Sequence, residues 1–225
     1  NAGIPLSCAA VIQEKEGMVV AHFTQLLKSK LEGEELLKEV GDFEKIKEHL
    51  TVRLFPSDYV TTNVDSFFVF RRDLEGTYTV LSFDLPSAVT NVKPEQAKLW
   101  GKTSDELFAI GFKNTFDKYM ANIEEVKFAE NIGLWFFGGN DVFVTTHAFD
   151  LDRYPQVIGK YGSLVILPHR QAMAVYPIES LEVVEVTNKM IAAATGMYKE
   201  GPGSITPNLF WYHEGKFTNI PYTFD

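Results

Sequence analysis

Cysteine is nearly missing from this sequence: Cys8 is the only one among 225 residues. One thiol cannot form an internal disulfide, so a disulfide-stapled secreted scaffold is excluded, as is a zinc site built on several cysteines. Cys8 has no nearby histidine, and we expect residues 1–17 to form a mobile N-terminal tail. We therefore interpret Cys8 as a bystander thiol rather than as a nucleophile.

Long apolar runs and basic runs are missing as well. No segment approaches the roughly 18 apolar residues that a membrane span needs. The formal net charge is −9, and no cluster of Lys and Arg supplies the positive field that binds nucleic acid or an anionic membrane. We expect a cytoplasmic protein with neither kind of partner. A removed N-terminal signal is the alternative, because the chain opens on Asn1-Ala2 rather than on methionine.

Catalytic signatures are the third absence. The chain has no Gly-x-Ser-x-Gly elbow of a serine hydrolase. The segment Gly201-Pro-Gly-Ser lacks the lysine and the following helix of a phosphate-binding loop. We therefore expect no cofactor, and we favour a non-catalytic function over an enzymatic one.

The first predicted helix is amphipathic. Its apolar residues recur at helical spacing: Val20, Phe23, Leu27 and Leu31. We expect Gly33 to end or break this helix. The charged stretch over residues 34–49 is predicted to form two shorter helical pieces, because Gly41 interrupts it.

Two later segments also predict helices. Thr103 and Glu106 form a capping box at the start of a helix over residues 103–120, whose aromatic side chains predict a central, buried position. Another helix is predicted over residues 179–195, closed by Gly196. Asn114 falls among the apolar positions of the first of these. We favour a buried amide that ties the helix to a neighbouring backbone, with ligand binding as the alternative.

Strand pairs joined by short turns make up much of the remaining chain. They are predicted over residues 66–72 with 77–83, 132–137 with 142–146, 164–167 with 172–176, and 209–212 with 216–220. Short turns favour antiparallel pairing, so we predict an α+β fold of hairpin-built antiparallel sheets with helices packed on one side. The 18 phenylalanines predict a core rich in aromatic rings. Residues 18–225 are predicted to form a single domain or, alternatively, two similar packed halves (18–137 and 138–225).

One segment resembles a weak metal site. His147, Asp150 and Asp152 offer an imidazole and two carboxylates, which a borderline or hard metal binds only if they converge on one point. A continuing strand would turn His147 and Asp150 to opposite faces. We therefore favour an N-cap role for Asp150 or Asp152 at the start of a short helix.

The best candidate site is the turn that carries His169 and Arg170. Arginine offers a two-pronged set of donors to an anion, and histidine titrates near neutral pH. A polar hairpin tip is the simpler interpretation of the same residues. If the protein is an enzyme, we expect His169, Arg170 and His147 to share a cleft between the halves.

Four segments occur in the order typical of one protein family. They are Leu99-Trp-Gly-Lys-Thr-Ser-Asp-Glu-Leu with Asn114 downstream, Asn140-Asp141, Leu164-Val-Ile-Leu-Pro-His-Arg, and the stretch from Ile205 to Phe217. Together they resemble the bacterial family called domain of unknown function 1444, over roughly Thr51 to Phe217. The resemblance implies a soluble α+β bacterial protein of unassigned activity, with no catalytic residue and no cofactor.

The chain departs from that family in two of these segments. The family's turn usually reads Pro-Asn-Arg-Asp, whereas this chain has Pro168-His169-Arg170-Gln171. The family's helix usually carries Ala-Leu-x-Asn-Leu, whereas residues 111–115 read Gly-Phe-Lys-Asn-Thr. Only Pro168, Arg170 and Asn114 carry over directly.

Two functions follow as hypotheses. The leading one is a non-catalytic protein-binding or adaptor module, similar to secretion chaperones or immunity proteins, that binds another protein or itself as a homodimer. It predicts an exposed apolar patch flanked by acidic groups. The alternative is a small-molecule hydrolase that uses His169, Arg170 and His147.

Overall fold

The structure is a computed structural model that describes residues 16–60, 64–130 and 132–222. Cys8 lies outside the described residues. The first helix begins at Glu16, inside the segment 1–17 for which a tail was predicted; residues 1–15 lie outside the described residues. Among the described helices, none is both long enough and apolar enough to cross a membrane.

The fold is α+β, as predicted, with two antiparallel sheets. In the first sheet, β3 (Thr77–Leu85) lies between β1 (Leu50–Pro56) on one side and β2 (Phe70–Arg71) and β4 (Ala88–Asn91) on the other. All nine residues of β3 are buried, since the strand is paired on both sides and covered on its faces.

The second sheet has six strands in the order β10-β9-β7-β8-β6-β5. Their bounds are β5 (Asn122–Ala129), β6 (Ile132–Gly138), β7 (Ser163–His169), β8 (Ala172–Pro177), β9 (Leu209–His213) and β10 (Lys216–Ile220). Two predicted hairpins are confirmed here, β7–β8 and β9–β10. The strand β6 forms its hairpin with β5 rather than with residues 142–146. The chain changes from one sheet to the other between Lys118 and Asn122, so residues 122–137 belong with the second sheet.

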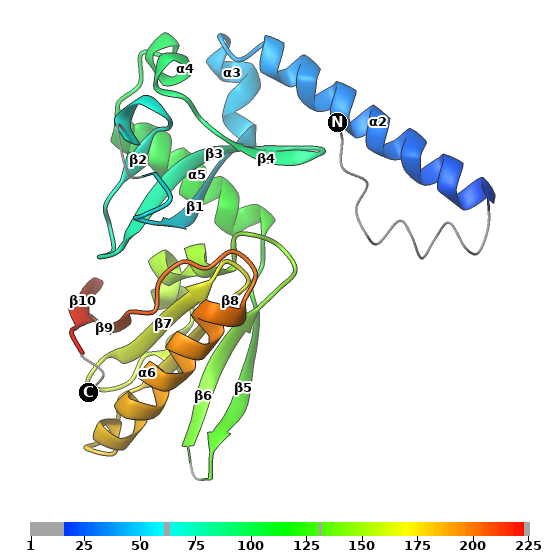
Figure 1. The fold of residues 1–225 in the computed structure, drawn as a ribbon. Helices are drawn as coiled ribbons and strands as arrows, with labels where there is room; N and C mark the ends of the chain where they lie inside the picture. Colours follow the sequence, from blue (N-terminus) through cyan, green and yellow to red (C-terminus); the bar gives the residue numbers. More distant parts are fainter. Residues whose placement is uncertain (1–15, 61–63, 131, 223–225) are drawn as a thin grey trace.

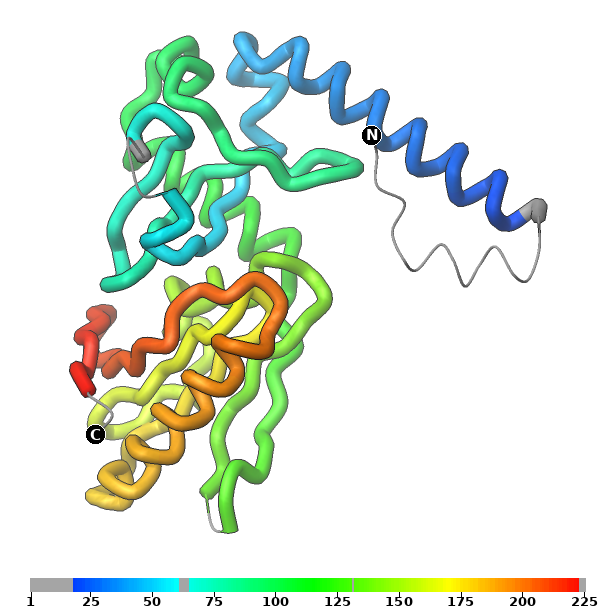
Figure 2. Tube along the Cα trace, viewed as in Figure 1, coloured from blue at the N-terminus to red at the C-terminus, as the bar shows by residue number. Residues whose placement is uncertain are grey.

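Helices cover both sheets (Figure 1). Their bounds are α2 (Glu16–Lys38), α3 (Phe43–Ile46), α4 (Pro94–Leu99), α5 (Ser104–Lys118) and α6 (Val183–Glu200), with 3₁₀ turns η1 (Lys47–His49), η2 (Val64–Ser66), η3 (Val144–Arg153) and η4 (Pro155–Val157). Helix α6 packs on the second sheet, where Val186, Met190 and Ala194 contact a buried cluster that includes Leu164 and Leu209. Helix α2 leaves the rest of the chain and projects outward, as the blue segment of Figure 2 shows.

Helix α5 lies unusually close to the first sheet. A Cβ atom at Gly111 would come within 2.8 Å of Val52 Cγ2 and 3.0 Å of Leu81 Cδ1, so only glycine fits there without a shift of the strand or helix. The capping box at the start of α5 is confirmed: Glu106 N–H donates to Thr103 Oγ1 (3.2 Å), and Thr103 N–H donates to Glu106 Oε2 (2.8 Å). The rings of Phe83 and Phe108 fill the space between helix and sheet, as the phenylalanine content predicted.

β1 is an edge strand whose free edge is buried, so its backbone groups need other partners. The amide of Asn114 donates to Leu50 O (2.9 Å). The N–H of Val52 donates to Thr115 Oγ1 (3.0 Å), and the Val52 carbonyl accepts from Thr146 Oγ1 (3.1 Å). Side chains of α5 and η3 therefore supply the hydrogen-bond partners that a further strand would otherwise provide at this edge.

The two sheets share part of their core. Leu54 of β1 and Leu74 of the β2–β3 turn belong to one buried cluster with Phe137, Val165 and Phe210 of the second sheet. The amide of Asn208 also donates to Glu75 O (3.3 Å). Contacts between the sheets are thus both apolar and polar.

Three local predictions were wrong. Residues 142–146 form no strand, because Asp141 Oδ1 accepts the N–H of Phe143 (2.8 Å) and turns the chain into η3. Gly33 lies inside α2 and packs against the β3–β4 turn. A Cβ atom added at Gly33 would lie 3.6 Å from Leu85 Cβ. Gly196 lies inside α6, which continues to Glu200 and stops before Pro202.

We expect Thr115→Val to destabilise the protein by about 1–3 kcal/mol, because valine has nearly the same shape but leaves the buried N–H of Val52 without an acceptor. Urea denaturation measures the change. Thr195→Val is the matched control: Thr195 bonds only the carbonyl of Ile191 in its own helix (3.0 Å). Equal losses in the two variants would contradict the role assigned to Thr115.

Candidate functional site

Helix α2 is attached to the protein through its C-terminal third. Leu36, Leu37 and Val40, which follows the helix, pack against the core of the first sheet. Gly33 is buried against the β3–β4 turn. The preceding turns extend beyond the sheet (Figure 1).

An apolar stripe runs along this projecting part. We define the α2 stripe as Val20, Phe23, Leu27 and Leu31. Val20, Leu27 and Leu31 are each more than 60% exposed, at 67%, 62% and 61%. Successive residues of a helix turn by about 100°, which places all four within a sector of about 80° and sets Val20, Leu27 and Leu31 well away from Leu36. Phe23, which is half-buried, lies at the edge of the stripe nearest the attached side. The stripe predicted from sequence therefore faces away from the core.

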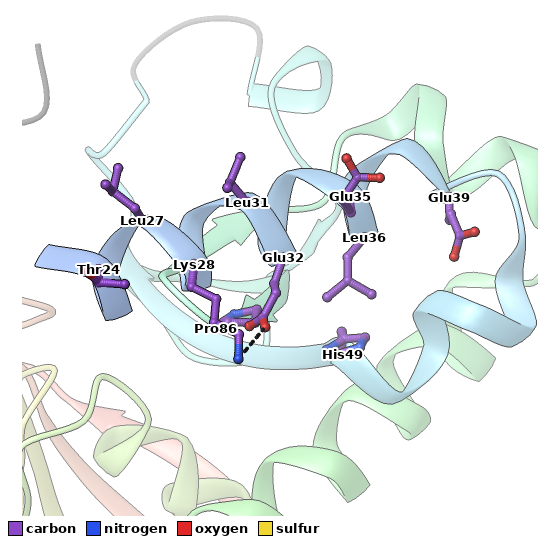
Figure 3. A pocket seen from close by; sticks show the side chains of 10 residues that line it. All are labelled: Thr24, Leu27, Lys28, Leu31, Glu32, Glu35, Leu36, Glu39, His49 and Pro86. Atoms are coloured by element: carbon purple, nitrogen blue, oxygen red, sulfur yellow. Dashed lines mark ion pairs between the residues drawn. The ribbon is translucent and has the colours of Figure 1, made fainter. Parts of the chain in front are cut away.

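A groove of about 1000 Å³ lies beside the stripe. Leu27, Leu31 and Leu36 line it from the helix, and His49 of η1 and Pro86 of the β3–β4 turn complete the lining. Figure 3 shows Leu36 pointing toward His49, while Leu27 and Leu31 point away from Pro86. The His49 ring is held by a 3.3 Å hydrogen bond between Nδ1 and the Asp84 carbonyl.

The charged flanks of α2 are largely neutralised by local ion pairs. These are Lys28–Glu32, Lys30–Glu34 and Lys38–Glu35, with Lys45–Glu39 just beyond the C-terminal end of the helix. Figure 3 shows the Lys28–Glu32 pair at the groove, where Lys28 Nζ lies 3.9 Å from Glu32 Oε1. Exposed pairs of this kind add little stability, but they leave the stripe between flanks of low net charge.

His169 and Arg170 extend from the β7–β8 turn in different directions. The His169 ring packs on the backbone of Gly201, where a side chain would not fit, and its Nδ1 accepts the N–H of Gln171 (3.4 Å). Burial lowers the pKa of His169. Arg170 lies against Gly203 and lines a separate cavity between the sheets.

His147 is buried, at 1% exposure, between α5 and η4. Its ring packs against Phe116 at 5.6 Å, and its Nδ1 lies 3.1 Å from the Tyr154 hydroxyl. Burial lowers the pKa of His147 and favours the neutral ring. His147 lines neither the groove beside α2 nor the cavity at Arg170, so the structure does not bring it to Arg170 there.

The carboxylates of the weak metal candidate have other partners. Asp150 lies at a kink within η3 and forms an ion pair with Arg153 Nε (2.6 Å), while burial raises its pKa. Asp152 Oδ1 accepts from the Tyr212 hydroxyl (2.9 Å). Within residues 16–60, 64–130 and 132–222, no group of three or more His, Cys, Asp or Glu side chains is placed to hold a metal.

Asn114 has the structural role favoured from the sequence. Its amide donates to the carbonyls of Lys47 and Leu50, both at 2.9 Å. These bonds fix α5 to the chain entering β1. Asn114 therefore positions the helix rather than facing the groove.

Sequence reasoning found the stripe but not its direction. Leu36, Leu37 and Val40 form a second apolar set on another side of the helix, and this change of side was the signal that α2 has two apolar faces. Comparisons with protein-family models, with curated proteins and with solved structures give no match. The functional proposal below therefore rests on the geometry of this chain.

Asn114→Ala is expected to lower the free energy of unfolding by about 1–3 kcal/mol, because two inward-facing carbonyls lose their donor. Thermal and urea unfolding check this. Lys113→Ala, on the exposed side of the same turn, is the control and should change stability far less. A neutral result for Asn114→Ala would show that these bonds do not anchor α5.

Stability should fall as the pH decreases through the normal histidine range. The pKa of His147 is lowered in the folded state, so below about pH 6.5 the unfolded state binds more protons than the folded state does. Proton binding therefore reduces the free energy of unfolding in that range. The contribution of the neutral His147 ring to stability is fully present above about pH 6.5, and it is lost as the pH falls toward the pKa of the folded state. His169 acts with the same sign.

His147→Gln should therefore flatten, but not abolish, the difference in unfolding free energy between pH 7.5 and pH 5.5. Urea denaturation at the two pH values measures it. His22→Gln, on α2, is the control. An unchanged pH dependence in His147→Gln would contradict the burial of a neutral ring at this position.

Proposed function

We propose that this protein is a non-catalytic protein-binding module that assembles through the α2 stripe, and that the stripe binds the same stripe of a second copy. One observation carries the proposal: the stripe faces away from the core to which α2 is attached. Burial of apolar surface contributes roughly 25 cal/mol per Å², so the exposed Val20, Leu27 and Leu31 beside the half-buried Phe23 favour a partner surface.

The spacing of the stripe suits an antiparallel pair. Its members lie nearly symmetrically about the middle of the segment from Val20 to Leu31. A two-fold axis that passes the stripe between the levels of Gln25 and Leu26 along the helix would set Val20 opposite Leu31 of the second copy. The same axis would bring Phe23 near Leu27 of the second copy. Such self-complementary interfaces with two-fold symmetry are the most common in homo-oligomers.

The charges and the groove also support a second copy. Two identical surfaces repel each other when their flanks carry unbalanced charge, but the ion pairs along α2 leave little net charge there. The groove beside Leu27 and Leu31 offers a lateral apolar wall to a helix that lies along α2. Helices pack at about 8–10 Å between axes, which brings such side chains into contact.

The adaptor role inferred from the sequence is consistent with this assembly. A dimer joined through a projecting helix leaves both sheets of each copy free for a further protein. The relationship to domain of unknown function 1444 remains a proposal on the segments quoted above.

The test is the mass of the full chain in solution, measured by light scattering after size exclusion and by sedimentation over a range of concentrations. We expect a dimer for the unaltered protein. Leu27→Glu combined with Leu31→Glu should weaken association at least 100-fold, because two buried carboxylates per copy would lack partners. Folding should be unaffected, since both positions are exposed.

Leu181→Glu is the matched control. Leu181 is 87% exposed and lies before α6, away from the stripe, so its substitution should leave the dimer intact. A protein that remains monomeric at all concentrations would overturn the second copy as occupant. So would a dimer that persists in the Leu27→Glu, Leu31→Glu variant.

A further inference from the structure

A second site lies between the two sheets and is independent of α2. It is a cavity of about 280 Å³ that contains two arginines, Arg53 from β1 and Arg170 from the β7–β8 turn. The other lining residues are Leu54, Phe55, Pro56, Tyr59, Val142, Gly203, Ser204 and Ile205. No carboxylate is among them, although the chain as a whole is acidic.

Arg53 is held in place but incompletely bonded. Its Nη2 donates to Asn91 Oδ1 (3.1 Å), and its guanidinium lies over the Phe55 ring, 4.4 Å from the centroid. Its Nε is buried without a hydrogen-bond partner. Buried guanidinium donors normally find acceptors, so Arg53 keeps hydrogen-bonding capacity that its protein partners do not use.

Arg170 is held at its backbone by the loop over residues 203–205. Its backbone N–H donates to Gly203 O (3.0 Å), and the next residues of the loop continue the pairing through Ile205 N–H to Pro168 O (2.9 Å). Gly203 has φ +68°, and a Cβ there would lie 2.8 Å from Arg170 Cδ. The glycine therefore leaves the space in which the Arg170 side chain lies.

Both arginines line the cavity, Arg53 as a partly buried residue and Arg170 as an exposed one. The ion pairs among the described residues include neither Arg53 nor Arg170. Burial, with a smaller contribution from the charge of Arg170, lowers the pKa of Arg53 to about 10. Arg53 still carries a charge near neutral pH, and an anion beside the two arginines would offset the cost of placing them together.

We infer that this cavity binds a small oxyanion, specifically a phosphate monoester whose apolar group packs on the aromatic side chains at the cavity mouth. Guanidinium groups match phosphate oxygens with paired donors. Phe55 and Tyr59, whose ring centroids lie 4.5 Å apart, supply an apolar surface next to the arginines. The site goes beyond the proposed dimerisation and uses none of its residues.

Titration calorimetry on the full chain tests the inference with three probes: inorganic phosphate, phenyl phosphate and benzoate. Chloride holds the ionic strength constant. We expect phenyl phosphate to bind more tightly than inorganic phosphate, because only the former carries a ring, and benzoate to bind most weakly. Arg53→Gln and Arg170→Gln should each weaken phenyl phosphate about 10- to 100-fold, the usual effect of losing hydrogen bonds to a charged group.

Arg72→Gln is the matched control. Arg72 also lies over aromatic rings, those of Phe70 and Tyr78, but it does not line the cavity, so binding should be unchanged. Gly203→Ala tests position rather than charge: it keeps both arginines but displaces Arg170, and should weaken binding as well. Circular dichroism confirms that each variant is folded.

Three results would overturn the inference. The first is no binding of phenyl phosphate at millimolar concentration. The second is binding that survives in Arg170→Gln, which lies in a turn and should fold normally even if Arg53→Gln does not. The third is an equal loss in Arg72→Gln, which would indicate general attraction to positive charge rather than a site.

Discussion

The buried free edge of β1 is the constraint on which the rest of the structure depends. An edge strand presents unpaired N–H and carbonyl groups, and burying them without partners costs several kcal/mol. Asn114 and Thr115 of α5 approach this edge from one side and Thr146 of η3 from the other. The same strand thus joins the helix of the first sheet to the segment that packs on the second sheet, and it also places Arg53 at the cavity between them.

Features that depend on near neighbours in the chain were predictable. The capping box at Thr103, the β7–β8 hairpin and the antiparallel α+β class follow from spacing and turn residues alone. Features decided by distant contacts were not. Gly33 continues its helix because it packs on the β3–β4 turn, and the expected strand over residues 142–146 is replaced by η3, where Asp141 caps a turn and Thr146 bonds β1.

The candidate sites show the same limit. The α2 stripe was visible as a pattern, but a pattern does not say which side of a helix meets the core. Arg170 was singled out together with His169 because they are adjacent in sequence. The structure instead places Arg170 at the same cavity as Arg53, a residue of the other sheet that no local motif distinguishes.

The attachment of α2 through Leu36, Leu37 and Val40 has an evolutionary consequence. Substitutions at most surfaces trade stability against interaction, since the same side chains serve both. Here the outward turns of the helix contribute little to the core, so natural variation could retune or abolish the proposed assembly without threatening the fold. If the proposed assembly holds, quaternary structure can change at this helix while the two sheets stay unchanged.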